Sequence, residues 1–519
     1  MTVISDLSAR SPRRKWWALA SLVLAVLAVG LDGTILSIAL PTLGRSFSAS
    51  TSELQWFVAA YTLVFAAALV PGGMLGDRYG RKKVLLLSLA VFGGASIACA
   101  LAPTAGTFIA ARALLGLGGA LMLPMVLGVI PVLFGKAERA RAIGAISAAA
   151  MLGYPIGPLL GGWMLTKFDW SWVFLLNVPV TAVAVVAVAI LLPESRSSLR
   201  KPIDTVGVAL SATGLALLTY GVISAGGAGW GDRAAIAEMI GGGVVLAAFL
   251  IWETRVSHPL VDLRLFRSRA FTWGATLSTI VSFAMFGLLF AVPLYVQVVR
   301  GADAQGSGLR VLPLIGGMLV GGILADRIAA GVGARLVACL GFTVFAGGLA
   351  LGAMTTVTTG DLQGVAWLAL CGLGLGLVLP TAIDAALGAA DDENSGVSSG
   401  ILQALRSAGG VFGAAILGAI MNTIYRDQLS HLGSSLPASA RGSAVAGADA
   451  ATTAHSPALL HAVRESFLSG MNTTLWICAA LMALGSVLAV AIRHRATAAP
   501  DTTAADAAAT GSRAPEFAA

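Results

Sequence analysis

A series of long apolar runs, joined by short charged connections, constrains this chain more than any other feature. Residues 76–83 read Gly-Asp-Arg-Tyr-Gly-Arg-Lys-Lys, and they lie between two apolar runs of membrane-spanning length. About 20 residues of helix cross a hydrocarbon core of roughly 30 Å. Backbone polar groups in lipid must be satisfied within their own segment, so each run is predicted to be an α-helix. The charged octet cannot enter the bilayer, which places both flanking helix ends at one membrane face.

Composition supports an all-α membrane protein. Apolar residues make up 57% of the 519 residues and charged residues only 11%, whereas soluble domains contain about 25% charged residues. The four cysteines are isolated within apolar runs and form no C-x-x-C pair. We therefore expect no disulfide, metal site or cofactor.

The distribution of positive charge predicts the orientation. Of the 33 lysines and arginines, 23 fall on one side of the predicted spans, 8 on the other, and 2 within apolar runs. This asymmetry follows the positive-inside rule and predicts that both termini lie in the cytoplasm. The expected location is a bacterial plasma membrane, which the chain would cross several times. No nucleic-acid motif accompanies the net charge of +8, so no nucleic-acid partner is expected. P-loop, H-E-x-x-H and partnered G-x-S-x-G patterns are also missing, which argues against an ATP-driven pump or an enzyme.

Fourteen spans can be placed by hydropathy. They are predicted near 17–40, 54–75, 84–102, 107–134, 142–165, 172–192, 204–225, 234–252, 271–296, 308–325, 333–356, 363–388, 398–421 and 472–492. The connection 422–471 is polar and predicted to be extracellular.

An internal repeat divides these spans. Leu123-Pro124 recurs 256 residues later as Leu379-Pro380, and at the same offset three glycines align with three others: Gly144, Gly153 and Gly157 with Gly400, Gly409 and Gly413. The repeat predicts two pseudo-symmetric six-helix bundles with two helices inserted between them. The predicted units are a cytoplasmic N-terminal segment (1–16), a first bundle (17–195), a two-helix insertion (196–256), a second bundle (257–495) and a disordered cytoplasmic tail (496–519).

Several motifs resemble one family of secondary transporters. The segment from Gly72 or Gly73 through Lys83 is similar to the G-x-x-x-D-R-x-G-R-R/K signature of the major facilitator superfamily. The stretch from Leu31-Asp32-Gly33-Thr34 to Pro41-Thr42-Leu43, together with the fourteen spans, resembles its 14-helix drug:proton antiporter subgroup. This resemblance covers nearly the whole chain except the tails and the 422–471 connection. It implies a proton-coupled multidrug exporter that works by alternating access.

Asp32 and Arg112 are the candidate proton-coupling residues. A carboxylate at bilayer depth costs about 2.5–3.5 kcal/mol on insertion scales, so such a residue usually faces a cavity or a partner. Arg112 is expected within about 5 Å of the depth of Asp32, from the helical rise. It begins a stretch similar to the family motif R-x-x-Q-G-x-G, with Leu115 in the glutamine position. The alternatives are a packing carboxylate at Asp32 and an arginine that snorkels to the headgroups.

The family resemblance implies that two glycine-containing motifs control the movement of the two bundles. The antiporter motif G-x-x-x-G-P-x-x-G-G is matched by Gly153, Pro155, Gly157, Pro158, Gly161 and Gly162. Glycines spaced by four allow close helix packing and prolines bend the axis, so this segment is predicted to be a hinge, although generic packing would use the same residues. A cytoplasmic latch is predicted at Gly76, Asp77, Arg78, Gly80 and Arg81. The same residues can also serve simply as a positive-inside anchor.

Further residues are candidates for substrate binding. Asp32 can contact a cationic substrate, Asp384 can also be a solvated interfacial acid, and Arg406 can also form a packing ion pair. Aromatic rings can hold cations by their faces, but they also serve as packing or lipid-facing groups. The aromatic candidates are Trp56, Tyr61, Tyr154, Phe286, Phe290 and Tyr295.

The resulting hypothesis is a monomeric exporter of hydrophobic or cationic drugs in exchange for protons, in contact with membrane lipids. One alternative keeps the fold but assigns a single cargo, such as a metabolite, an antibiotic, a lipid or a siderophore. A sensor or scaffold is the other alternative, but it would need a soluble module that neither tail has the composition to form.

The topology can be tested with reporter fusions. Fusions after Lys83, Lys201 and Arg495 should report a cytoplasmic location, and fusions within 430–460 should report the exterior. A cytoplasmic 430–460 segment would contradict the fourteen-span count.

Overall fold

The computed structural model describes residues 12–196, 202–388, 395–430 and 438–490, and the regular structure within these ranges is helical. The first long group consists of α1 (Pro12–Ser46), α2 (Thr51–Tyr79), α3 (Arg81–Ala100), α4 (Ala105–Leu133), α5 (Lys136–Lys167), α6 (Ser171–Leu175) and α7 (Asn177–Leu191). Two helices follow, α8 (Thr205–Ala228) and α9 (Arg233–Arg255). The remainder is η1 (Leu263–Arg267), α10 (Arg269–Leu294), η2 (Tyr295–Val299), α11 (Ala304–Val332), α12 (Ala334–Gly352), α13 (Asp361–Leu387), α14 (Ser395–Ser430), α15 (Ala438–Arg441), α16 (Ala444–Thr453) and α17 (Pro457–Ala489).

The structure confirms the predicted all-α membrane protein and approximately the predicted number of spans. Within the described ranges, thirteen helical segments are long and apolar enough to cross a membrane, with α6 and α7 counted as one. Helix α5, 32 residues long, packs along α1 and corresponds to the remaining predicted span.

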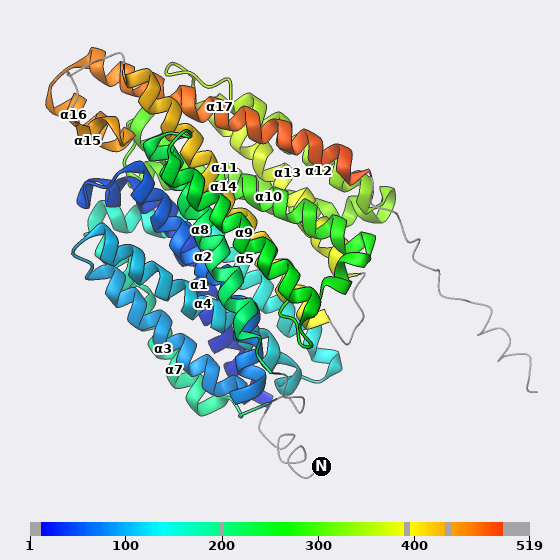
Figure 1. The fold of residues 1–519 in the computed structure, drawn as a ribbon. Helices are drawn as coiled ribbons and strands as arrows, with labels where there is room; N and C mark the ends of the chain where they lie inside the picture. The colour runs from blue at the N-terminus through cyan, green and yellow to red at the C-terminus, as the bar shows by residue number, and fades with distance from the viewer. Residues whose placement is uncertain (1–11, 197–201, 389–394, 431–437, 491–519) are drawn as a thin grey trace, which may run out of the picture.

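The long helices pack into two groups with a helix pair beside them (Figure 1). In the first bundle, α1 packs against α5 and α7, and α4 packs against α2 and α3. In the second bundle, α10 packs against α13 and α14, α13 against α11 and α12, and α17 against α12 and α14. In the pair α8–α9, α8 packs against α2 and α14, and α9 packs against α8. The domain boundaries proposed from the sequence stay a prediction.

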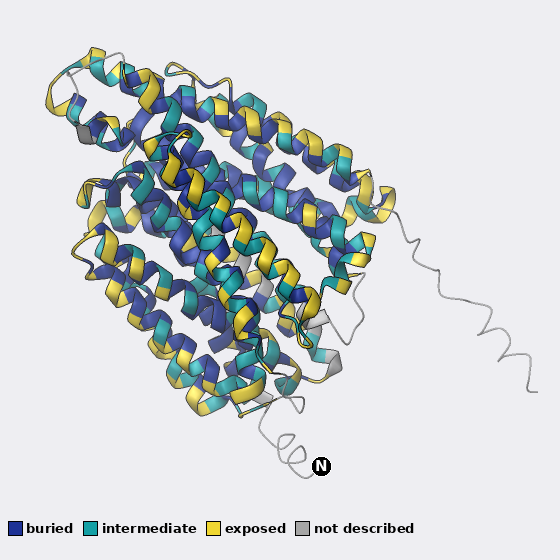
Figure 2. Cartoon of the chain, in the orientation of Figure 1, coloured by how far each residue is buried: buried dark blue, intermediate teal, exposed yellow. Residues whose placement is uncertain are grey.

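The helices end at two opposite faces of the molecule. The Asp77 face contains residues 76–83, and the α16 face contains α15 and α16 (Figure 1). Buried residues concentrate where helices meet, and exposed residues lie on the outer helix surfaces (Figure 2). Many exposed side chains are apolar, including Leu87, Val183, Ile240 and Leu250. Such side chains suit lipid, because acyl tails are as apolar as leucine.

The repeat seen in the sequence corresponds to equivalent helix contacts. A Cβ on Gly153 would lie 3.1 Å from the Gly30 carbonyl carbon, and one on Gly157 would lie 2.0 Å from Thr34 Oγ1, so α5 packs closely on α1. At the repeat offset, Gly409 and Gly413 pack in the same manner on Thr279 and Phe283 of α10. Helix α5 therefore packs on α1 in the same way as α14 packs on α10.

The connection between the last two spans differs from the prediction. Helix α14 continues to Ser430 and α17 begins at Pro457, so both extend well beyond the predicted edges at 421 and 472. Ser456 caps α17 by accepting a hydrogen bond from the backbone of Leu459, and Pro457 suits the first helical turn. Hydropathy identified only the hydrocarbon-spanning part of these helices. Residues 1–11 and the predicted tail lie outside the described residues, whereas 12–16 begin α1.

Gly157→Ala should destabilise the protein by roughly 1–3 kcal/mol, because an added methyl group must push α5 away from Thr34. Gly144→Ala on the same helix is the matched control, since no atom lies within 4 Å of its added Cβ. Thermal denaturation of the purified protein in detergent measures both. Equal midpoints for the two variants would contradict the close packing of α5 on α1.

Candidate functional site

A buried ion pair lies at the centre of the first bundle. Arg112 Nη1 donates to Asp32 Oδ2 at 2.6 Å, and the two residues are 1% and 4% exposed. Arg112 Nε also donates to the Phe57 carbonyl at 3.1 Å. The guanidinium lies over the Tyr61 ring, 4.7 Å from its centroid. The pair thus joins α1, α4 and α2.

Glycines of α4 allow Arg112 to reach this position. A Cβ on Gly116 would lie 2.3 Å from the Tyr61 carbonyl oxygen, and one on Gly118 would lie 2.8 Å from the Phe92 nitrogen. A Cβ on Gly119 would lie 3.0 Å from the Tyr61 hydroxyl. These contacts bring α2 and α3 close to α4 and set the depth of the arginine. Leu115, in the motif's glutamine position, is fully buried.

The Asp32 carboxylate is buried and is held in a charge-assisted hydrogen bond with Arg112. The next residue, Gly33, is exposed, and no atom lies within 4 Å of the point where its Cβ would stand. A proton on Asp32 and the ion pair with Arg112 are mutually exclusive, because protonation removes the negative charge. The proton-coupling role of both residues stays a prediction.

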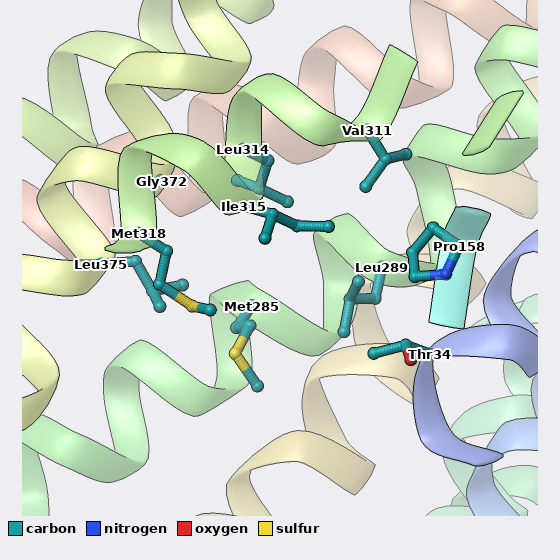
Figure 3. A pocket seen from close by; sticks show the side chains of 10 residues that line it. All are labelled: Thr34, Pro158, Met285, Leu289, Val311, Leu314, Ile315, Met318, Gly372 and Leu375. Carbon is teal, nitrogen blue, oxygen red and sulfur yellow. The ribbon is translucent and has the colours of Figure 1, made fainter. Parts of the chain in front are cut away.

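A second feature is an apolar pocket between the bundles (Figure 3). The space in and at the mouth of this pocket amounts to about 390 Å³, part of which is open to the surroundings. Thr34 of α1 and Pro158 of α5 line it from the first bundle, and α10, α11 and α13 supply the rest: Met285, Leu289, Val311, Leu314, Ile315, Met318, Gly372 and Leu375. None of these ten lining residues carries a charge.

The predicted hinge segment forms part of the wall of this pocket. Gly153, Gly157 and Gly161 of α5 face α1, whereas Gly162 faces α11 with its added Cβ only 2.7 Å from the Ala304 carbonyl oxygen. The Pro158 carbonyl in turn lies 2.2 Å from the point where a Cβ on Gly308 of α11 would stand. Helix α5 is therefore in close contact with both bundles. Pro155 is half-buried.

The predicted latch residues interact within the first bundle. Arg81 Nη2 donates to Asp77 Oδ1 at 2.8 Å, and its Nη1 donates to the Gly128 carbonyl of α4 at 2.7 Å. Gly76 packs against Met125, and the exposed Arg78 lies over the Tyr79 ring. Gly80 has a φ of +115°, a conformation that glycine adopts readily. The latch role stays a prediction.

At the α16 face, hydrogen bonds connect the two bundles. Gln297 donates to the Ile38 carbonyl at 3.1 Å, and Gln55 donates to the Ala415 carbonyl at 2.8 Å. Both glutamine side chains are buried. Neither glutamine was predicted from the sequence, although a lone amide in an apolar run is itself a signal, because a buried polar group needs a partner.

The α15–α16 segment adds a second set of contacts between the bundles. Both the backbone nitrogen and the Oγ1 of Thr51 donate to the Gly442 carbonyl, at 3.1 and 2.9 Å. Arg45 Nε donates to Asp449 Oδ2 at 2.9 Å. On the second-bundle side, the buried Tyr425 hydroxyl donates to the Ala440 carbonyl at 3.0 Å. The segment therefore bridges the ends of α1, α2 and α14.

The remaining substrate-binding candidates do not gather at the pocket. Trp56 packs against Tyr220 of α8 at a centroid distance of 5.8 Å, and Phe286 contacts Gly410 of α14. Phe290 and Tyr295 are buried, Asp384 is exposed near the end of α13, and Arg406 donates to Gln403 within α14. The Tyr154 side chain lies outside the described residues. Among the residues described, no group of three or more His, Cys, Asp or Glu could hold a metal ion.

The sequence of this chain matches the model of a known protein family. A model of the Major Facilitator Superfamily matches residues 22–414. The chain belongs to the Major Facilitator Superfamily. The resemblance inferred from the sequence motifs is thus confirmed, and this member of the superfamily is a multi-pass membrane transporter.

Similar members of the superfamily include named exporters. The tetracenomycin C resistance and export protein of Streptomyces glaucescens is 32% identical over 502 residues, which cover 92% of each chain. The multidrug efflux pump LfrA of Mycolicibacterium smegmatis is 32% identical over 494 residues, covering 93% of this chain and 98% of LfrA. The probable actinorhodin transporter of Streptomyces coelicolor is 33% identical over 423 residues, covering 78% of this chain and 72% of that protein.

A solved structure shares the fold of this superfamily member. A bacterial homolog of the human lysosomal transporter Spinster, crystallised in an inward-facing and unoccupied conformation, superposes with a TM-score of 0.65 at 18% identity. The match covers 93% of this chain and 99% of that chain.

Closure of the α16 face can be tested by cross-linking. Thr51→Cys combined with Gly442→Cys should form a disulfide on mild oxidation, because the two backbones already share a hydrogen bond of 3.1 Å. A protease site inserted at 197–201 separates the fragments on a gel unless the disulfide joins them. Each single cysteine variant is the control. Failure of the pair to cross-link in membranes would contradict closure at this face.

Proposed function

We propose that this protein is a proton-coupled exporter of hydrophobic compounds. The observation that carries the proposal is the Asp32–Arg112 ion pair, 2.6 Å long and almost completely buried in a transporter of this superfamily. A charge pair in the membrane is costly to maintain, so a carboxylate there is a functional-site hypothesis by default. The similarity to export proteins and efflux pumps supports the direction of transport.

The ion pair supports a simple coupling scheme. When Asp32 takes up a proton, it loses the negative charge that attracts Arg112, and α1 and α4 are no longer joined by an ion pair. Thr34, two residues after Asp32, lines the apolar pocket. Its hydroxyl lies 3.3 Å from the Gly153 carbonyl of α5 and 3.2 Å from the Gly30 and Leu31 carbonyls of α1, and it can donate to one of these three. A change around Asp32 is therefore passed along α1 to the pocket and to the helix between the bundles. Rocking of one bundle against the other would then expose the pocket at alternate faces.

The pocket lining favours uncharged apolar substrates over cations. Its walls are methionine, leucine, isoleucine and valine side chains, with the Thr34 hydroxyl as the polar group from a side chain. The Asp32 carboxylate is already paired with Arg112, and Asp32 is not among the residues that line the pocket. A dedicated exporter of one hydrophobic antibiotic is the second candidate, supported by the tetracenomycin C and actinorhodin relatives.

We also propose that the protein lies in a bacterial plasma membrane with its Asp77 face toward the cytoplasm. The excess of basic residues on that side supports this orientation. The structure then corresponds to a state that is closed toward the exterior.

Asp32→Asn should abolish proton-coupled efflux, because the amide cannot exchange a proton. Substrate-driven proton movement in inverted vesicles measures this, with the amount of protein in the membrane checked in parallel. Asp384→Asn is the control, since this acid is exposed near the end of α13. If Asp32→Asn still moves protons and Asp384→Asn does not, the coupling group is Asp384 and the role proposed for Asp32 is wrong.

A further inference from the structure

A second pair of buried acids lies outside the site described above, in the inserted helix pair. Asp204 directly precedes α8, and Glu253 lies two residues before the last residue of α9, both at the Asp77 face. They are 8% and 4% exposed. Neither acid belongs to the motifs of the superfamily found in the sequence, and neither contacts Asp32 or the apolar pocket.

The two carboxyl groups face one another across Gly207. The point where a Cβ on Gly207 would stand lies 2.4 Å from Asp204 Oδ2 and 2.7 Å from Glu253 Oε1. These two oxygens are therefore at most about 5 Å apart, with only the glycine hydrogens between them. Glycine is needed here because a side chain would separate the acids.

The hydrogen bonds of the two acids are unequal. Asp204 accepts from the Gly207 backbone at 2.8 Å and from the Trp252 indole at 3.0 Å. Glu253 Oε2 accepts from the Val261 backbone at 2.8 Å, whereas Glu253 Oε1 is buried without a partner. A buried oxygen that lacks a donor is costly, and two adjacent buried carboxylates repel one another.

One proton resolves both costs. If Glu253 carries it on Oε1, this oxygen can donate to Asp204 Oδ2, and Asp204 keeps its negative charge in a site that supplies two N–H donors. Within the described part of the chain, no lysine, arginine or histidine forms an ion pair with either acid. The nearby Arg255, His258 and Asp262 are exposed. Arg200 and Lys201 precede Asp204 in the sequence and lie outside the described residues.

We propose that Asp204 and Glu253 form a proton-binding pair that holds one shared proton and fastens the inserted helices to the second bundle. Glu253 holds the Val261 backbone, and Val261 packs against an apolar cluster that includes Phe271 of α10 and Ile401 of α14. Loss of the proton places two charges against each other at this joint and loosens it. The pair is independent of the proton exchanged at Asp32.

The sign of the pH dependence follows from the proton count. The folded protein holds a proton that the unfolded chain releases at neutral pH, so stability falls as the pH rises through the titration of the pair. One proton changes the ratio of folded to unfolded protein by up to about tenfold per pH unit. The pair stabilises the fold at low pH, and this contribution is lost on the alkaline side.

The test combines infrared spectroscopy with thermal denaturation of the full-length protein in detergent. The wild type should show the carbonyl band of a buried protonated carboxyl group, and its denaturation midpoint should fall as the pH is raised. Glu253→Gln should remove the band and the pH dependence, because the amide is neutral and can donate to Asp204. Asp204→Asn should do the same, because its amide can donate to an ionised Glu253, and it keeps the test informative if Glu253→Gln fails to fold.

Matched variants separate the pair from other effects. Asp232→Asn should keep the wild-type pH dependence, because Asp232 caps α9 at its other end by accepting from the Ala235 backbone and has no facing acid. Asp32→Asn should retain the band of the pair, and Glu253→Gln should retain proton-coupled efflux, so failure here is distinct from failure of the proposed export function.

Three outcomes would overturn the proposal. The first is a Glu253→Gln variant whose denaturation midpoint depends on pH as that of the wild type does. The second is an Arg200→Gln/Lys201→Gln variant that loses the pH dependence, which would mean that a cation rather than a shared proton neutralises the acids. The third is a denaturation midpoint that rises when sodium replaces choline in the buffer, which would mean that a metal cation occupies the site.

Discussion

Every polar group placed in the hydrocarbon core must find its partner inside the protein, because no water is available there. The backbone meets this requirement by forming helices, which is why this chain is divided into long apolar helical segments. A buried charged side chain such as Arg112 meets it by tertiary contact. Arg112 does so through Asp32, the Phe57 carbonyl and the Tyr61 ring, and these three partners come from two other helices.

The same constraint shapes the contact between the bundles. Apolar burial drives helix association only weakly in lipid, so close backbone packing and interhelical hydrogen bonds become important. Helix α5 uses glycines on one side to approach α1 and a glycine and a proline carbonyl on the other to approach α11. Gln55 and Gln297 add hydrogen bonds across the α16 face. The pocket lies beside α5, where a movement of this helix would change its walls.

The extent to which the site could be predicted depended on the kind of residue. Asp32 and Arg112 were identifiable because a charge within an apolar run is conspicuous, and helical rise placed them at similar depth. The glycines of α5 were identifiable from their spacing of four. Trp56 and Phe286 illustrate the limit, because an aromatic residue in an apolar helix is equally suited to packing. Their contacts with Tyr220 and Gly410 depend on how helices rotate about their axes, which hydropathy does not specify.

The sequence by itself determined the helical class, the approximate number of spans, the internal repeat and the family, since each depends on local hydropathy or on residue spacing. Only the tertiary structure decided which faces of the helices meet. It brought Thr51 into contact with Gly442, 391 residues away in the sequence, and extended α14 and α17 beyond their hydrophobic parts. It also left the pocket without charge and placed Glu253 against Asp204. These outcomes depend on the packing of helices far apart in sequence, and no local pattern records that packing.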